Sequence, residues 1–333
     1  MAILTKLELA DVAALAREFG IDAARWLPIE AGSVNTNGRV ESHDGKSYFL
    51  RVYEEQTEVT ARHEAALLRA LAAAGVPTPV PLPRKGGSGF IAAFADKPVA
   101  MFPFVAGRSA CQKTVTEERA RLVGAALARV HDAGAAILDG PLGAHVGVGR
   151  FERRDLLGRL GGLEGLRLAP DVKAAQAQLT DALESLDTTP TDRGPIGFIH
   201  GDLFRDNVLF DHDGGTVLLD FESASRGPVA FDLAVTILAW CFGDDLDLAL
   251  AASLVAGYQT ARALHPQCRA ALFDEALFAC IRFATTRITD FELRPAGSGT
   301  FKDFRRWLAR ERALRAIGRA GLERALFGHA SSR

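Results

Sequence analysis

The chain has 333 residues, of which 48% are hydrophobic and 24% are charged, and its formal net charge at pH 7 is −2. This length allows a large buried core and two lobes, and the balanced charge argues against nucleic acid or an anionic membrane as a partner. No apolar run approaches the roughly 20 residues needed to cross a bilayer. Charged residues also interrupt the N-terminal segment, which therefore does not resemble a secretion signal.

Four cysteines bear on the cellular compartment. They are widely spaced and form no C-x-x-C pair, at Cys111, Cys241, Cys268 and Cys280. This pattern favours reduced, buried thiols, and we expect a cytoplasmic protein.

The N-terminal third alternates between helical and strand-like patterns. A short amphipathic helix is predicted over 11–19, followed by strands over 39–42 and 48–53 with a turn at 43–46 between them. A helix over 57–74 ends at Gly75, and strands over 90–94 and 99–105 follow. The order of strand, strand, helix, strand, strand predicts an antiparallel sheet with one packed helix.

Helical spacing dominates after residues 104–107. Helices are predicted over 116–134, 229–241, 249–263, 272–292 and 301–327, with a helix-rich stretch from 153 to 186. The last of these is rich in arginine, but its apolar residues recur at helical spacing, which favours a docked amphipathic helix over an RNA- or lipid-binding one. A sheet lobe followed by a helical lobe is typical of a protein-kinase-like α+β fold.

The segment from Phe198 to Phe210 carries the clearest chemical signal. His200, Asp202, Leu203 and Asn207 have the H-x-D-L-x-x-x-N spacing of a kinase catalytic loop, and an apolar run ends at Asp220. Phosphoryl transfer needs a carboxylate to accept the proton of a hydroxyl, and oxygen ligands for Mg²⁺. Asp202, Asn207 and Asp220 supply these groups.

The local pattern explains how these residues meet. Short apolar runs at 196–199, 208–210 and 217–219 predict strands, and residues 211–215 predict a hairpin turn between the last two. Each Asp alone could be a turn former or a helix cap, but the set at fixed offsets favours an active site. His200 is interpreted as a scaffold of the loop, because Asp202 already fills the position of the base.

The chain resembles the superfamily of aminoglycoside phosphotransferases and choline kinases, and within it the homoserine kinases of that fold. The resemblance rests on the segments 200–207, Phe231-Asp232-Leu233-Ala234, 239–242, 257–259, Arg282-Phe283, Thr286-Arg287 and Lys302-Asp303, which recur in order. It implies a nucleotide-binding lobe with a linker strand over 1–104 and a helical lobe over 105–333. It also implies ATP and Mg²⁺, with Asp202 as the catalytic residue and Asn207 and Asp220 as metal ligands.

The resemblance assigns nucleotide contacts to the first lobe. The turn at 32–37 would cover the phosphates with Ser33, Asn35, Thr36 and Asn37, although such a turn alone is more often an ordinary hairpin. Arg51 stands where protein kinases have a Lys, and Glu64 on the next helix is its natural partner. Either residue could instead be an exposed charge.

Three further roles follow from the resemblance. The backbone of 101–105 would bind adenine and its side chains Met101, Phe102 and Phe104 would line the base, although Pro103 removes one donor. Glu222, in the place of the Gly of a D-F-G motif, supports a second metal or caps the next turn. Asp232 would brace the catalytic loop.

The acceptor site is expected to hold charges of both signs. An amino-acid acceptor needs a cation for its carboxylate and an anion for its ammonium, and the candidates are Arg205, Arg282, Arg287, Asp290, Glu292 and Lys302. For each of them a surface ion pair is the competing interpretation.

These expectations converge on an ATP-dependent kinase for a small hydroxyl acceptor. The resemblance favours L-homoserine and threonine biosynthesis, in a monomer or homodimer. The alternatives are an amino alcohol, an aminoglycoside or another metabolite as the acceptor, an inert nucleotide-binding module, or a protein kinase. The last is disfavoured because Gly227-Pro228 follows Asp220 so soon that little room is left for a platform for a protein substrate.

Overall fold

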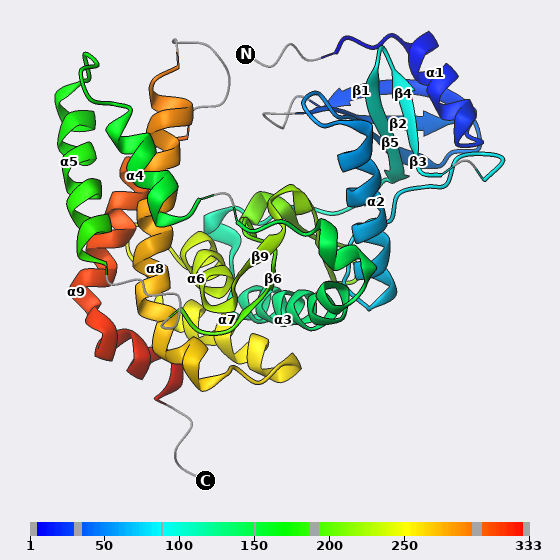
Figure 1. Cartoon of the computed structure of the whole chain (residues 1–333). Coiled ribbons are helices and arrows are strands. Elements are labelled where there is room, and N and C mark those ends of the chain that lie inside the picture. The colour runs from blue at the N-terminus through cyan, green and yellow to red at the C-terminus, as the bar shows by residue number, and fades with distance from the viewer. Residues whose placement is uncertain are drawn as a thin grey trace. The chain divides into compact units, whose positions relative to one another are not determined.

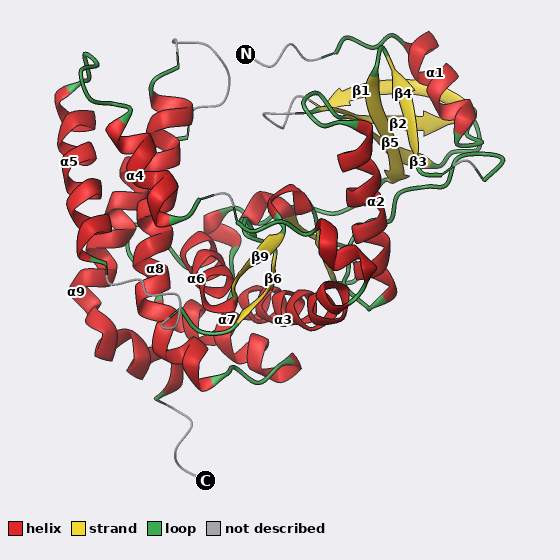
Figure 2. Cartoon of the chain, in the orientation of Figure 1, coloured by secondary structure: helices red, strands yellow, loops and turns green. Residues whose placement is uncertain are grey.

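The computed structural model describes residues 5–29, 35–87, 89–149, 151–186, 193–294 and 302–328. The chain divides into two compact units, Met1–Arg108 with Asp211–Glu222, and Ser109–Phe210 with Ser223–Arg333. The first contains a five-stranded sheet and the second is mainly helical (Figures 1 and 2), which gives the expected α+β class. Within the described ranges, no helix is long and apolar enough to cross a membrane. The assignment of functions to lobes 1–104 and 105–333 stays a prediction.

The sheet of the first unit is antiparallel throughout, in the order β1-β2-β3-β5-β4. Its elements in chain order are α1 (Leu9–Glu18), β1 (Ala23–Ile29), β2 (Thr36–Ser42), β3 (Ser47–Val52), α2 (Glu58–Ala73), β4 (Ile91–Phe94) and β5 (Lys97–Pro103). The predicted helices and the four predicted strands are all present, with ends that differ by a few residues. The turn at 211–215 also forms, since Asp211 Oδ1 accepts from the N–H groups of Asp213 and Gly215.

Strand β1 is absent from the sequence prediction. Its sequence AARWLPI contains Pro28, which cannot donate to a ladder and therefore weakens a strand pattern. The structure places β1 at the edge of the sheet, where proline is tolerated. The predicted order of strand, strand, helix, strand, strand is thus wrong, because it lacks β1, which precedes the first predicted strand.

The two faces of this sheet differ in character. Leu50 and Val52 of β3 lie in a hydrophobic core with Val12 and Leu15 of α1. Because side chains alternate along a strand, Arg51 between them projects to the other face. There it meets α2, and this face carries the polar residues of the candidate site.

The second unit is built from seven α-helices in the described part of the chain, together with a small two-stranded sheet. They are α3 (Glu117–Asp139), α4 (Arg153–Gly161), α5 (Pro170–Ser185), α6 (Val229–Trp240), α7 (Leu248–Ala261), α8 (Pro266–Arg287) and α9 (Arg305–Phe327), and β6 (Ile196–Ile199) pairs with β9 (Ser225–Pro228). Every residue of α6 is buried, which matches its apolar sequence. Helix α6 contacts α8, and α8 contacts α9.

The segment predicted as one helix over 272–292 differs in two ways. Helix α8 begins earlier, at Pro266, where His265 accepts from the N–H of Gln267 as the N-cap, a position that suits a following proline. It also ends earlier, and Ile288–Glu292 continue as a π-helix. Such wide turns often occur at functional sites. The last predicted helix, over 301–327, is described only from residue 302 and begins at Arg305.

Candidate active site

The predicted catalytic loop follows β6 and begins with a tight turn. Gly201 has a φ of +77°, and a Cβ at this position would lie 2.9 Å from the carbonyl oxygen of Ser223. Both the left-handed backbone and the close approach favour glycine. The glycine between His200 and Asp202 is therefore required by the geometry of the loop.

Asp232, in the first turn of α6, fixes the backbone of this loop by hydrogen bonds. Its two carboxylate oxygens accept from the backbone N–H groups of His200 and Gly201, at 2.7 Å each. Asp232 and His200 are both completely buried. The expected bracing of the catalytic loop by Asp232 is thus confirmed in its geometry.

Two residues from other helices, His131 and Tyr258, extend the hydrogen-bond network of Asp232. His131 Nε2 on α3 lies 3.0 Å from Asp232 Oδ2, and His131 Nδ1 lies 2.8 Å from the hydroxyl of Tyr258 on α7. A carboxylate can only accept, so Nε2 donates to it. Burial raises the pKa of Asp232, but the hydrogen bonds from His131 and the loop amides outweigh it, and the net pKa lies below its ordinary value. Asp232 therefore carries its charge in the folded state.

The loop is also fixed along its length. Asn207 Nδ2 donates to the carbonyl oxygen of Asp202 at 2.8 Å, and the indole of Trp240 donates to the carbonyl of Leu203 at 3.0 Å. The amide oxygen of Asn207 is the atom that a metal ion would bind. The side chain of Asp202 is thereby held on a loop whose backbone is anchored at several points.

Asp202 lines a cavity of about 660 Å³ in the second unit. Four of the predicted acceptor residues line it as well: Arg282, Arg287, Asp290 and Lys302. The remaining lining residues are Phe151, Phe204, Asp206, Phe283, Thr286, Phe291, Asp303 and Arg306. The π-helix after α8 contributes Asp290 and Phe291, so the change in helical pitch lies at this cavity.

Two predicted acceptor residues, Arg205 and Glu292, are not part of the described lining of the cavity. Arg205 is partly buried, and its Nη1 finds no hydrogen-bond partner among the described residues. Burial, followed by the nearby charge of Arg306, lowers the pKa of Arg205. Glu292 forms an ion pair with Arg305 at 3.1 Å.

In the first unit, Arg51 joins the polar residues of the sheet to α2. Its Nη1 lies 3.7 Å from Glu64 Oε1 and 3.5 Å from Glu222 Oε1, and its Nε donates to Asn37 Oδ1 at 3.3 Å. The side chains of Arg51 and Glu64 are only 15% and 8% exposed. The predicted pairing of Arg51 with Glu64 is present, and its role toward a nucleotide stays a prediction.

Glu222 forms contacts that the sequence did not indicate. It accepts from Asn35 Nδ2 as well as from Arg51. Burial raises the pKa of Glu222 to about 7, and the negative charge of Asp220 adds to the shift. Glu222 therefore ties Asn35, just before β2, to Arg51.

Asp220 has two features expected of a metal ligand. Its φ of +62° lies in the left-handed region, which is strained for a residue with a Cβ. Its Oδ1 is buried and has no hydrogen-bond partner among the described residues. A buried carboxylate oxygen without a donor is costly unless a cation binds it. These observations fit a metal ion at Asp220.

Several predicted nucleotide contacts are not part of this cluster. Ser33 lies outside the described residues. The hydroxyl of Thr36 contacts Glu54 and the N–H of Thr5 instead. The carbonyl of Met101 accepts from Leu82 N–H at 2.7 Å, and Phe104 N–H donates to Ser47 at 3.1 Å. Two backbone groups of the predicted adenine segment are therefore already engaged.

The side chains of that segment lie in different surroundings. Met101 is completely buried in the core on the α1 side of the sheet, and Phe102 is 6% exposed. Phe104 is partly exposed, and the guanidinium of Arg39 lies 4.8 Å from its ring centroid. Among the three, Phe104 thus has the most open side chain.

Comparison with known proteins identifies the family. The sequence matches the family described as "Phosphotransferase enzyme family" over residues 25–271, which is more than half of the chain. The chain belongs to this family. A relative named homoserine kinase, from Phenylobacterium zucineum, is 31% identical over 303 residues, which cover 90% of each of the two chains.

Solved structures show the same fold as this phosphotransferase. A spectinomycin phosphotransferase, solved with ADP and spectinomycin, has a TM-score of 0.65 at 12% identity and covers 97% of the chain and 99% of its own. Amicoumacin kinase, solved with AMP-PNP and Ca²⁺, has a TM-score of 0.65 at 15% identity, with 94% and 93% covered. The phosphotransferase therefore has the expected kinase-like fold. Its family implies a nucleotide, a divalent metal and a small-molecule hydroxyl acceptor.

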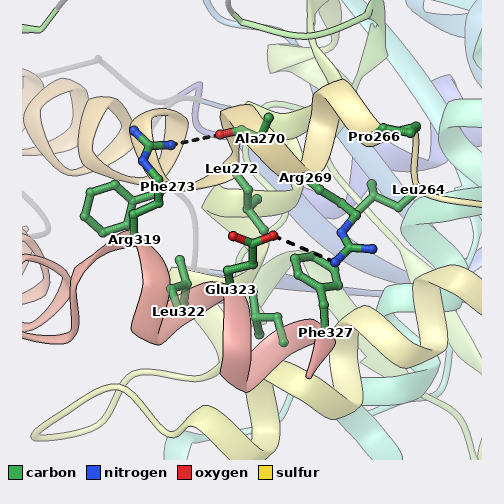
Figure 3. A pocket seen from close by; sticks show the side chains of 11 residues that line it. Leu264, Pro266, Arg269, Ala270, Leu272, Phe273, Arg319, Leu322, Glu323 and Phe327 are labelled. Atoms are coloured by element: carbon green, nitrogen blue, oxygen red, sulfur yellow. Dashed lines mark hydrogen bonds and ion pairs between the residues drawn. The ribbon is translucent and has the colours of Figure 1, made fainter. Parts of the chain in front are cut away.

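A second cavity of the phosphotransferase, of about 480 Å³, lies between the beginning of α8 and the end of α9 (Figure 3). Its arginines are engaged. Arg269 pairs with Glu323 of the lining at 3.9 Å, and Arg319 donates to the carbonyl oxygen of Ala270 of the lining at 2.9 Å and pairs with Asp274 outside the lining at 2.6 Å. Its lining is otherwise mostly apolar, with Phe273 and Phe327. Of the residues predicted for the active site, the described lining contains none.

Proposed function

We propose that this phosphotransferase transfers the γ-phosphoryl group of ATP to the side-chain hydroxyl of L-homoserine, in threonine biosynthesis. The observation that carries the proposal is the cavity at Asp202, whose lining holds Arg282, Arg287, Asp290 and Lys302. A zwitterionic amino acid with a hydroxyl group needs this combination: a base for the hydroxyl and charges of both signs for its carboxylate and ammonium. The homoserine kinase relative supports the same acceptor.

The residues of the second unit would act on the acceptor. Asp202 orients the hydroxyl and accepts its proton as the hydroxyl oxygen attacks the γ-phosphorus and ADP departs. The loop bonds to Asp232 keep this carboxylate at a fixed position, so that little reorganisation is needed during the reaction. Asn207 would contribute its amide oxygen to the metal ion.

The residues of the first unit would act on the nucleotide. Arg51, Asn35 and Asn37 offer donors to the phosphates, while Glu64 and Glu222 orient Arg51. Asp220 would be a metal ligand together with Asn207, and we propose Mg²⁺ as the ion. When bound, Mg²⁺ neutralises charge on the phosphates. Phe102 and Phe104 would contact the adenine.

We also propose a cytoplasmic location and a monomeric or homodimeric state. Amino alcohols and aminoglycosides are the competing acceptors, because kinases of such molecules share the fold. Their positive charge suits the cavity less well, since four cationic side chains line it, Arg282, Arg287, Lys302 and Arg306.

The test is homoserine-dependent ADP release by the wild type and by Asp202→Ala, measured with ATP and Mg²⁺. We expect turnover with L-homoserine in the wild type and none in the variant. Nucleotide binding, measured by calorimetry, should be nearly equal in the two proteins because the proposed role of Asp202 is toward the acceptor. Substantial turnover by Asp202→Ala would remove Asp202 from the role of base.

A further inference from the structure

The charges that line the cavity at Asp202 are not equally available to a ligand. Asp290 already accepts from Arg159 Nη1 at 2.6 Å, and Asp303 forms an ion pair with Arg305 at 3.1 Å. Both partners lie outside the lining of the cavity, so these two carboxylates are largely neutralised before an acceptor enters. Positive charge therefore predominates inside the cavity.

Among the cations of the cavity, Arg282 is the one best placed to bind a ligand. Arg287 donates to the carbonyl oxygen of Asp303 at 2.9 Å, and Lys302 Nζ lies over the ring of Phe291 at 5.3 Å. Arg306 is exposed to solvent. Among the described residues the guanidinium of Arg282 contacts aromatic rings and has no hydrogen-bond or ion-pair partner, so its donors are open to an anion.

Aromatic rings hold the guanidinium of Arg282 in place. It lies 3.7 Å from the ring centroid of Phe283 and 4.8 Å from that of Phe151. Phe283 in turn stacks on Trp307 at 4.5 Å, and Phe204 meets Phe283 edge to face at 5.1 Å. Phe204 follows Asp202 by two residues, so these rings connect Arg282 to the catalytic loop.

We infer that Arg282 selects the acceptor by its carboxylate, so that the cavity takes hydroxy acids in preference to amino alcohols. This inference rests on the proposed function, in that it takes Asp202 as the position of the reacting hydroxyl. A guanidinium stacked on rings keeps its planar edge open, and that edge matches a carboxylate with two parallel hydrogen bonds. An acceptor that carries only an ammonium group meets repulsion at the same place.

The surroundings of Arg282 strengthen this role. Burial lowers the pKa of Arg282 to about 10, and the charge of Asp202 opposes the shift. The guanidinium is still charged at neutral pH, but it is poorly solvated. A partly desolvated cation gains more from a carboxylate than a solvated one does, because its attraction is less screened.

Two truncated forms of homoserine test the inference directly. 4-Hydroxybutyrate keeps the hydroxyl and the carboxylate but lacks the ammonium, whereas 3-amino-1-propanol keeps the hydroxyl and the ammonium but lacks the carboxylate. We would measure kcat and KM for L-homoserine and both analogues with the wild type, Arg282→Gln, Arg282→Lys and Arg306→Gln. Arg306→Gln is the matched control, since it removes one positive charge from the same cavity.

The wild type should prefer 4-hydroxybutyrate to 3-amino-1-propanol. In Arg282→Gln the ratio of their kcat/KM values should fall on the order of 100-fold, mainly through KM, as expected for the loss of charge-assisted hydrogen bonds. Arg282→Lys should give an intermediate ratio because it keeps the charge but not the planar fork. Arg306→Gln should change the ratio only slightly, because the guanidinium of Arg306 is exposed and water screens its charge.

Three outcomes would overturn the inference: a wild type that prefers 3-amino-1-propanol, an unchanged ratio in Arg282→Gln, or an equal fall in Arg306→Gln. If Arg282→Gln does not fold, the ratio of kcat/KM values for the two analogues in Arg282→Lys serves as the test, and an unchanged ratio there overturns the inference. Failure on L-homoserine with the predicted ratio for the analogues would reject the proposed function and keep the inference. No turnover of any of the three acceptors would reject both.

Discussion

At the residue scale, the polar cluster of the first unit carries unbalanced charge. Arg51 is the one cation that the described contacts assign to it, and it faces the carboxylates of Glu64, Glu222 and Asp220. Burial, followed by the negative charge of Asp220, raises the pKa of Glu222. A divalent cation at Asp220 would remove this excess of negative charge, which is why the cluster fits a metal site.

Asp220→Asn should therefore have opposite effects on stability and on metal binding. Without metal, the variant should be more stable than the wild type by about 1–3 kcal/mol, because a negative charge that repels the carboxylates of Glu64 and Glu222 is removed. The stabilisation that Mg²⁺ gives to the nucleotide-bound wild type should be lost. Thermal unfolding with and without Mg²⁺ and ATP measures both effects.

Asn is the matched replacement, since it keeps the shape of the side chain and, like Asp, tolerates a positive φ. A variant that is less stable without metal and is stabilised by Mg²⁺ as well as the wild type would show that Asp220 is a structural residue and not a metal ligand.

The carboxylate of Asp232 should make the stability depend on pH in acid. Its pKa lies below the ordinary value of 3.8 in the folded state, so it stabilises the fold above that pH, and this contribution is lost as the pH falls through the lower, folded pKa. Asp232→Asn should be less stable than the wild type by about 3 kcal/mol near neutral pH. The difference should shrink below about pH 4.

Denaturant unfolding of both proteins across this pH range measures the difference. If the difference in free energy of unfolding between the wild type and Asp232→Asn stays constant from neutral to acid pH, the carboxylate of Asp232 is not charged in the folded protein.

At the scale of elements, α3 and α7 cross at two glycines. A Cβ on Gly257 would lie 2.0 Å from the carbonyl oxygen of Arg121, and one on Gly124 would lie 1.9 Å from that of Leu254. The neighbouring Tyr258 contacts His131 across the same pair of helices. The close crossing of α3 and α7 thus keeps Tyr258 against His131, which hydrogen-bonds to Asp232 at the catalytic loop.

Gly257→Ala should destabilise the protein by about 3 kcal/mol, because the helices must separate to admit the methyl group. Gly158→Ala is the control: this glycine lies inside α4 with nothing within 4 Å of the added Cβ, so it should gain up to about 1 kcal/mol from helix propensity. Chemical denaturation of the wild type and of both variants measures the changes in free energy of unfolding. Equal effects of the two substitutions would contradict the close crossing of α3 and α7.

Local sequence patterns predicted much of the fold and part of the site. The catalytic loop is recognisable because its residues lie within a few positions of one another, and the pairing of Arg51 with Glu64 follows from a strand that precedes a helix. The sequence did not predict strand β1, because Pro28 interrupts the pattern that is typical of a strand. The early beginning of α8 was missed although Pro266 is a signal for a helix start.

Contacts between distant residues could not be read in this way. His131 meets Asp232 across 101 positions and Tyr258 across 127 positions. Glu222 meets Asn35 and Arg51 across 187 and 171 positions. No periodicity relates such pairs, since they depend on how helices and strands pack. The stacking of Arg282 on Phe283 joins adjacent residues, but its orientation into a cavity depends on the turns of α8 and the π-helix.

At the scale of the whole molecule, the proposed function divides the chemistry between the two units. The first carries Arg51 and Asp220, and the second carries Asp202 and the cavity lined by Arg282. We expect a kinase whose acceptor is defined by the second unit alone. The identity of the molecule that receives the phosphoryl group therefore decides the proposed function.

The most direct measurement is a competition in which ATP, Mg²⁺ and the protein meet an equimolar mixture of L-homoserine, L-serine, L-threonine, choline, ethanolamine and kanamycin, with the products identified by mass spectrometry. We expect O-phosphohomoserine as the dominant product, and its absence from the same mixture with Asp202→Ala. Phosphorylation of choline, ethanolamine or kanamycin in preference to homoserine, or no phosphorylated product at all, would contradict the proposed function.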